Sequence, residues 1–136
     1  MATSGGGTET VAMGCALCER LEHSELRGST DTVAAFDDGF PSTPGHTLVV
    51  PKRHVARLTE LTEQEHRELW QECLRQQHRL AALAPDGFTV GVKDGEAAGQ
   101  TIAHVHLHVI PRHHGDTQRA RGGVRWAVSE TAQYWA

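Results

Sequence analysis

The chain has 136 residues, of which 38% are hydrophobic and 22% charged, and its formal net charge at pH 7 is −4. This length fits one domain that can bury a core without disulfide bonds. The negative charge argues against general nucleic-acid binding, and no apolar run approaches the roughly 20 residues of a membrane span, so we expect neither nucleic acid nor membrane as a partner. Residues 1–14 contain three consecutive glycines and nothing typical of a signal peptide, which favours a disordered leader and a cytoplasmic protein.

The first elements expected along the chain are two strands and a helix. Residues 32–36 (TVAAF) and 46–50 (HTLVV) are apolar runs separated by a turn-rich stretch, which predicts an antiparallel hairpin with a long loop. Thr62 and Glu65 fit a capping box at the start of a helix that ends near Ala84. Apolar residues recur in it at helical spacing, which predicts one stripe packed against a sheet. These residues are Leu69, Trp70, Cys73, Leu74, Leu80 and Leu83.

Two further strands are expected after the helix, over residues 88–93 and 102–110, with a glycine-containing loop between them. Strands, one long helix and more strands predict an α+β domain in which the helix lies on one face of an antiparallel sheet. The tail from Gly115 is rich in glycine and arginine and then in aromatic residues. Its arginines are consistent both with a solvated basic loop and with an anion-attracting rim beside a site.

The most informative segment is residues 103–111, in which every second position is a histidine: His104, His106 and His108. In a strand these three side chains would share one face, with valine and leucine on the other face against the core. Imidazole can attack, donate, accept or bind a metal near neutral pH, so the run predicts a functional site. Both a metal site and nucleophilic catalysis are possible. The glycine-rich loop before the run, with Gln100 and Thr101, favours attack on phosphorus, because its N–H groups and those side chains can hold phosphate oxygens.

The three cysteines cannot all pair, and two of them, Cys15 and Cys18, form a Cys-x-x-Cys motif. No thioredoxin-like pattern surrounds this motif, and metal binding would need ligands from elsewhere in the chain. Cys73 lies on the apolar side of the expected helix, where we expect a buried small hydrophobe.

Several segments resemble the histidine triad (HIT) superfamily. Residues 95–112 (GEAAGQTIAHVHLHVIPR) are similar to its signature, and residues 43–54 (TPGHTLVVPKRH) and 36–38 (FDD) resemble its upstream landmarks. Residues 121–126 (RGGVRW) resemble the tail of bacterial members. The resemblance implies a HIT-like fold and divides the chain into a leader (residues 1–14), a HIT domain (15–126) and a C-terminal tail (127–136).

The resemblance implies a hydrolase or transferase that acts at the α-phosphate of a nucleotide conjugate, such as a diadenosine polyphosphate or a nucleoside phosphoramidate. By analogy, His106 is the nucleophile, and it forms a covalent nucleotidyl-histidine intermediate that water then cleaves. His108 contacts the phosphate or the leaving group, and His46 supports His106. Gln100 and Thr101 bind phosphate oxygens. A nucleotide-binding module or sensor with little turnover is the alternative from another class, and a catalytic metal on the triad is a third interpretation.

The same resemblance implies contacts to the rest of the nucleotide. Asp38 would accept hydrogen bonds from the ribose hydroxyls, although it could simply be a turn residue. Phe36 and Leu17 are candidates for a slot around an adenine base, although Phe36 could equally be part of the core. Lys93 stands where relatives usually carry Asn or Gln next to the phosphates. A lysine there could bind more negative charge or turn outward.

In the zinc-containing branch of the superfamily, the resemblance pairs the Cys-x-x-Cys motif with two histidines. The four ligands would be Cys15, Cys18, His54 and His104, a closed Cys₂His₂ set that is typical of structural zinc. Two reduced thiols with His54 exposed on a loop are the alternative. The resemblance also implies a homodimer.

Overall fold

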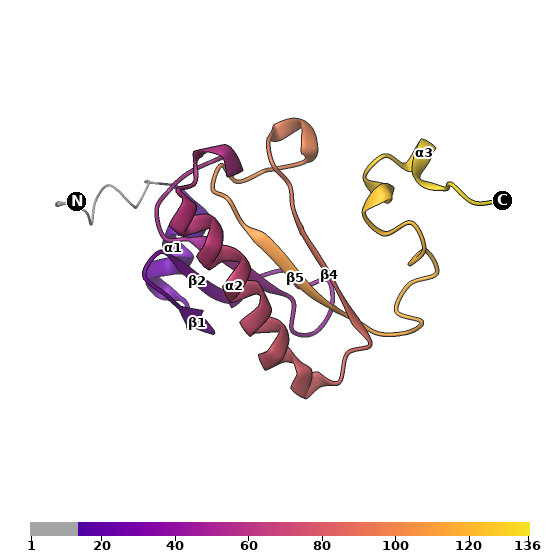
Figure 1. Ribbon diagram of the computed structural model, residues 1–136, viewed down its shortest axis with the longest axis horizontal. Coiled ribbons are helices and arrows are strands. Elements are labelled where there is room, and N and C mark those ends of the chain that lie inside the picture. Colours follow the sequence, from indigo (N-terminus) through magenta and orange to yellow (C-terminus); the bar gives the residue numbers. More distant parts are fainter. Residues whose placement is uncertain (1–13) are drawn as a thin grey trace.

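The computed structural model describes residues 14–136. Apart from Gly14, the predicted leader therefore lies outside the described residues. The strands are β1 (Gly28–Ser29), β2 (Val33–Asp37), β3 (Thr47–Pro51), β4 (Gly87–Val92) and β5 (Leu107–Arg112). They form one antiparallel sheet in the order β1-β2-β3-β5-β4 (Figure 1). Both antiparallel pairs predicted from the sequence, β2 with β3 and β4 with β5, are present, and the pairing of β3 with β5 joins them.

The helices are α1 (Ala16–His23), α2 (Glu63–Leu80) and α3 (Ser129–Ala132). Short 3₁₀ turns are η2 (Leu58–Glu60), η3 (Ala81–Leu83), η4 (Glu96–Ala98) and η5 (Gly123–Ala127). The predicted capping box of α2 is confirmed, since the Thr62 hydroxyl accepts from the Glu65 N–H and the Glu65 carboxylate accepts from the Thr62 N–H. Helix α1 was not predicted, although Leu17 and Leu21 stand at the helical i, i+4 spacing within its eight residues.

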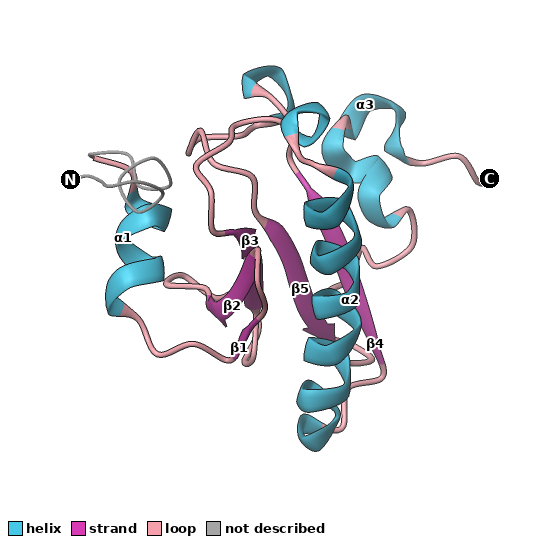
Figure 2. Cartoon of the chain, turned by 60° about the vertical axis from the view of Figure 1, so that its left-hand side comes forward, coloured by secondary structure: helices cyan, strands magenta, loops and turns pink. Residues whose placement is uncertain are grey.

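The two longer helices lie on opposite faces of the sheet (Figure 2). On one face, α2 packs Leu69, Cys73 and Leu80 against alternate residues of the strands, including Leu107 and Val109. Cys73 is the buried small hydrophobe that the sequence predicts. On the other face, α1 packs against the remaining alternate residues of β2 and β3. That second cluster consists of Cys15, Leu17, Cys18, Phe36, Leu48 and Val50.

The apolar stripe of α2 is narrower than the sequence predicts. Trp70 and Leu74 are 51% and 58% exposed, whereas Leu69 and Cys73 are buried. Each exposed residue follows a buried one by one position, and one position turns a side chain by about 100° around a helix. Leu83 is also exposed, since it lies beyond the end of the helix.

The strand predicted for residues 102–110 begins only at Leu107, so only His108 of the three histidines belongs to a strand. Pairing of β3 with β5 stops at Val49 and Leu107. Continuing it would require Pro51 to take part, and proline has no N–H to donate to a neighbouring strand. The chain therefore leaves the ladder before Leu107. The predicted alternation persists, because Val105, Leu107 and Val109 all pack in the cluster under α2.

The segment after Arg112 leaves the sheet and forms η5 and α3 beside β4 (Figure 1). Arginines of this region contact residues close to them in the chain: Arg112 forms an ion pair with Asp116, and Arg119 lies over the ring of Trp126. The turn η5 extends across residues 126 and 127, where the sequence predicts the start of the tail. Among the described residues, no helix is long and apolar enough to cross a membrane.

Candidate active site and metal cluster

His106 is buried at the end of the irregular stretch before β5, and its own backbone neighbourhood fixes its tautomer. Its Nδ1 lies 2.8 Å from the carbonyl oxygen of His104, which can only accept a hydrogen bond. A neutral imidazole carries one N–H and one lone pair, so the proton sits on Nδ1 and the lone pair on Nε2. The ring also lines a cavity. His106 therefore presents an unprotonated nitrogen that can attack a ligand in that cavity.

A chain of hydrogen bonds orients the neighbouring His108. The Ser42 N–H donates to His46 Nδ1 at 3.0 Å, so the His46 proton sits on Nε2 and can be donated to His108 Nδ1 at 2.9 Å. His108 then carries its own proton on Nε2, a buried atom without a hydrogen-bond partner among the described residues. Burial, reinforced by His106 and His46, lowers the pKa of His108 to about 4. His108 is thus a neutral imidazole, next to His106, whose buried N–H has no partner among the described residues.

Asp38 faces these imidazoles. One carboxylate oxygen lies 3.3 Å from His46 Nε2 and 3.9 Å from His108 Nδ1, and the other accepts the N–H of Phe40 at 2.7 Å. The second contact is the turn role that remained open for this residue. Burial lowers the pKa of His46 while the charge of Asp38 opposes that shift. Asp38 also lines the cavity, so its carboxylate is accessible to a ligand.

The cavity beside His106 and His108 has a volume of about 480 Å³, within the range of small-molecule sites. Helix α1 forms one wall through Leu17 and Arg20, and Leu48 and Ile102 add apolar surface. Leu17 therefore lies where a base slot is expected. No sequence signal placed Arg20 there, because α1 itself was not predicted.

Phe36 is not part of the cavity in which the base slot was predicted. Its ring is completely buried in the cluster under α1 and does not line the cavity. The Arg20 guanidinium lies 4.6 Å above the ring centre and separates it from the outside. Phe36 supports the wall of the cavity as a core residue, which was the alternative interpretation.

The Gln100 side chain is held within its own loop, and its contact with phosphate oxygens stays a prediction. Its side-chain oxygen accepts the Gly95 N–H at 2.7 Å, and its side-chain nitrogen donates to the Ala56 carbonyl at 2.9 Å. Both ends of the amide are therefore used to close the loop around η4. Thr101 is exposed at the end of this loop. Lys93 lies on the far side of His108 from the first cavity, where it lines a second one.

Four thiol and imidazole groups converge under α1, and their donor atoms all lie within 4.8 Å of one another. They are Cys15, Cys18, His54 and His104. His104 Nδ1 lies 3.6 Å and 3.5 Å from the two sulfur atoms, and 3.3 Å from His54 Nδ1. The Nε2 of His104 is 2.8 Å from the Pro51 carbonyl, which keeps the proton there and leaves Nδ1 free to bind a metal.

These distances fit a tetrahedral zinc ion. With Zn–S near 2.3 Å and Zn–N near 2.0–2.1 Å, a regular tetrahedron separates S from N by about 3.5 Å and N from N by roughly 3.3 Å. The group Asp38, His46 and His108 is also compact, but its 2.9 Å N···N separation is a hydrogen-bond distance. His104 and His108 thus belong to two different groups of possible metal ligands, and His106 belongs to neither group.

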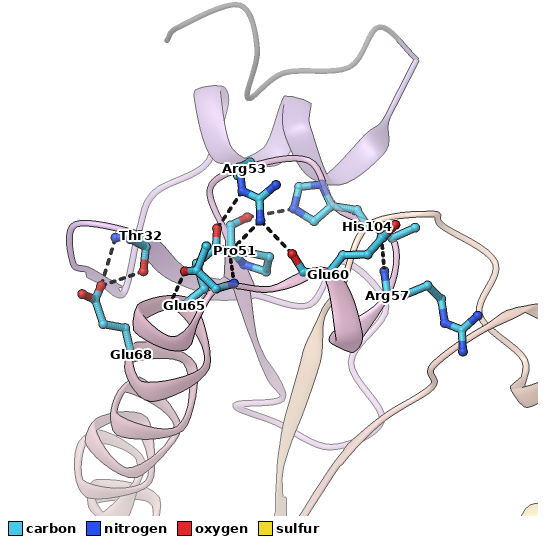
Figure 3. A network of polar contacts seen from close by, with 10 residues as sticks. Thr32, Pro51, Arg53, Arg57, Glu60, Glu65, Glu68 and His104 are labelled. Carbon is cyan, nitrogen blue, oxygen red and sulfur yellow. Dashed lines mark hydrogen bonds and ion pairs between the residues drawn. The ribbon is translucent and has the colours of Figure 1, made fainter.

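Charged contacts fix the segment that carries His54 (Figure 3). Arg53 donates to the Glu65 carboxylate at 2.8 Å and 3.1 Å, and to the Glu60 carbonyl at 2.9 Å. Because Glu65 also caps α2, Arg53 ties the segment to the helix that covers the other face. Figure 3 shows His104 directed at Pro51 within the same group of contacts.

Comparison with known proteins identifies the family. Residues 21–115 match the family model of the HIT domain. The chain belongs to the HIT family. A bis(5'-adenosyl)-triphosphatase of Dictyostelium discoideum is 39% identical over 97 residues, which cover 68% of this chain and 62% of that protein. A bis(5'-nucleosyl)-tetraphosphatase (asymmetrical) of Schizosaccharomyces pombe is 40% identical over 94 residues, which cover 68% and 52%. The chain thus spans less than two thirds of the length of these two relatives.

Among HIT structures, a zinc-bound histidine triad family protein from Mycobacterium smegmatis is similar at 32% identity. The match covers 77% of this chain and 79% of that one, with a TM-score of 0.70. The α+β architecture predicted from the sequence is therefore that of the HIT fold.

Proposed function

We propose that this HIT protein is a hydrolase that cleaves nucleotide conjugates at the α-phosphate through a covalent intermediate on His106. The names of the Dictyostelium and Schizosaccharomyces relatives support a nucleoside polyphosphate as substrate. The single observation that carries the mechanism is the 2.8 Å contact between His106 Nδ1 and the His104 carbonyl. It leaves Nε2 as the nucleophile and stabilises the positive charge that the ring acquires on attack.

The reaction has two steps. In the first, His106 Nε2 forms a bond to the α-phosphorus, and the bond from phosphorus to the leaving group breaks. The Nε2–H of His108 donates a hydrogen bond to the leaving-group atom as its charge develops. In the second step, water attacks the same phosphorus, the P–N bond breaks, and the proton of the water is released. His106 returns to its neutral state, and the nucleoside monophosphate leaves.

The test compares turnover of adenosine phosphoramidate and diadenosine tetraphosphate by the wild type and by His106→Asn. We expect the variant to lose turnover of both by at least about 10³-fold, since it keeps a polar group of similar size but no nucleophile. Nucleotide binding and the thermal unfolding midpoint should persist. Equal turnover by the two proteins would contradict the assignment of His106. Binding of AMP without cleavage of either substrate by the wild type would instead support the sensor.

A structural zinc ion in the cluster of Cys15, Cys18, His54 and His104 is the second part of the proposal. The support is the donor geometry together with the zinc-bound HIT neighbour. A bound zinc would fix α1 to the segment that precedes β5, and the four protein ligands would leave no position for a substrate. Metal analysis of the purified protein should find about one zinc per chain.

The third part concerns assembly. Trp70 and Leu74 expose apolar surface on the outer side of α2, and we expect that surface to be covered in a homodimer. Light scattering coupled to size-exclusion chromatography tests this. A monomer at micromolar concentration would contradict it.

A further inference from the structure

A second cavity, of about 710 Å³, begins at His108 and extends over the open face of β4 and β5. His108 lines this cavity as well as the first one, so it stands between the two. Lys93 and the loop around η4 form one end of the second cavity. Val124 and Val128, from the segment after the sheet, form the other. The cavity under α1 and this second cavity therefore share His108 as a common wall.

Gly91 provides the floor of the second cavity. It lies directly opposite His108 in the pairing of β4 with β5, and a Cβ built at Gly91 would meet nothing within 4 Å. The next pair on the same face is Thr89 with Ile110, which also line the cavity. The hollow thus follows the strands away from His108.

The positive charge in this cavity is concentrated at the end near His108, where Lys93 lies. Lys93 lies with its stem close to Gly99, whose Cβ position is 3.4 Å from the Lys93 Cδ, and the ammonium makes no ion pair within the described part of the chain. Burial is the main cause of the lowered pKa of His108, and the positive charge of Lys93 makes the smallest contribution to it. Near His108 the cavity therefore offers an uncompensated cation, and the unpartnered N–H of His108 lies buried beside it, whereas the far end of the cavity is apolar.

We propose that this second cavity is the leaving-group subsite and that it takes a nucleoside polyphosphate. The inference rests on the proposed function, because it places the α-phosphate at His106. The phosphates of the leaving group lie between His108 and Lys93, and the nucleoside packs on Ile110, Val124 and Val128. The small neutral amine released from a phosphoramidate would use neither the cation nor the apolar end. The cavity thus favours dinucleoside polyphosphates over phosphoramidates.

His108 and Lys93 each have a role when the leaving group departs. When the bond from His106 to the α-phosphorus forms, the P–O bond to the leaving nucleoside polyphosphate breaks, and its electron pair stays on the departing oxygen. The Nε2–H of His108 donates a hydrogen bond to that oxygen. Lys93 offsets the negative charge that accumulates on the adjoining phosphates.

The experiment places a larger side chain at the floor of the cavity and measures nucleotide binding. All variants are made in the His106→Asn background, so that no turnover occurs. Gly91→Leu adds a side chain to the hollow. Gly87→Leu is the matched control, since Gly87 lies on the same strand and the same open face, its Cβ position is equally free, and it does not line this cavity. Dissociation constants for AMP and for diadenosine tetraphosphate are measured by calorimetry for both variants and for the parent.

We expect Gly91→Leu to raise the ratio of the tetraphosphate constant to the AMP constant by about tenfold or more, and Gly87→Leu to leave that ratio unchanged. Lys93→Met should raise the ratio too, by an amount that shrinks at high salt. An unchanged ratio in Gly91→Leu would overturn the subsite. Should that variant fail to fold, Ala127→Trp fills the same cavity from the opposite wall.

The subsite and the proposed function can each fail independently of the other. Selective weakening of tetraphosphate binding by Gly91→Leu would establish that this cavity binds the second nucleotide even if the wild type hydrolysed nothing. Conversely, His106-dependent hydrolysis with an unchanged ratio would leave the function standing and overturn the subsite.

Discussion

His104 and His108 come from the same short run of alternating histidines, yet they lie in two different environments. His104 is fully buried, with one nitrogen on the Pro51 carbonyl and the other facing the sulfur atoms under α1. His108 is 21% exposed and accepts from His46, and its buried Nε2–H has no partner among the described residues. Residue type and spacing were the same for both, so partners from distant segments decide which imidazole is a ligand and which is a donor.

The two environments meet in one residue. The His104 ring faces the metal cluster, while the His104 carbonyl holds the Nδ1–H of His106. Two of the candidate ligands, Cys15 and Cys18, lie at the start of α1, which walls the first cavity. If the cluster binds zinc as proposed, damage to it should therefore reach His106, whereas damage around His106 and His108 should leave it intact. The predictions below test this asymmetry.

The largest effect is expected on the metal side. Cys18→Ser should release zinc and lower the free energy of unfolding by about 4 kcal/mol when free zinc in the wild-type sample exceeds its dissociation constant a thousandfold. Nucleotide binding should weaken at the same time, because α1 loses its anchor. Zinc content, urea unfolding and AMP binding are the measurements.

Cys73→Ala is the matched control, since Cys73 is equally buried but packs in the apolar cluster under α2. It should keep its zinc and its nucleotide affinity, with a smaller loss of stability. Equal zinc content in the two variants would contradict the assignment of the cluster.

A smaller and more local effect is expected on the catalytic side. His46→Asn removes the imidazole whose Nε2–H is donated to His108 Nδ1, so His108 loses the partner that keeps its proton on Nε2. We expect kcat to fall about 10²-fold, the lower range for a group that assists proton placement, with zinc content unchanged. His114→Asn, at a fully exposed histidine, is the control for the substitution itself. Loss of zinc from His46→Asn would show that the two regions are coupled in both directions.

The third prediction concerns pH. Burial lowers the pKa of His108 from 6.5 to about 4, so between these pH values the unfolded chain binds a proton that the folded chain does not. Stability should therefore rise with pH across this window and fall on acidification, by up to about 3 kcal/mol from this residue. His46 and His104 act in the same direction, because burial lowers the pKa of both. Urea unfolding at a series of pH values should show a shallower slope in His108→Asn than in the wild type. An identical slope would mean that His108 is protonated in the folded state.

Elements that depend on residues close together in the chain could be predicted from the sequence. The capping residues Thr62 and Glu65 are three positions apart, and the alternation of residues 107–109 is read within one strand. The grouping of Cys15 and Cys18 with distant histidines was predicted from the HIT resemblance, because residue spacing alone does not indicate it.

Contacts between distant segments explain the failures. Phe36 is a core residue because α1 covers that face of β2, and α1 was not predicted from the sequence. The late start of β5 depends on Pro51, which lies more than 50 positions before it in the chain. Gln100 is engaged by Ala56, 44 positions away. No pattern within a single segment shows such partners.

Gln100 provides the smallest and most discriminating test. If its amide closes the loop around η4, Gln100→Ala should lower the free energy of unfolding by about 1 kcal/mol, because the Gly95 N–H and the Ala56 carbonyl lose a partner. Hydrogen exchange at the Gly95 amide should accelerate. Thr101→Ala, at the exposed neighbouring position, should change neither quantity. Unchanged stability together with weaker AMP binding in Gln100→Ala would restore the direct phosphate contact that the HIT resemblance implies. The loop that walls the leaving-group subsite would then be held by something other than Gln100.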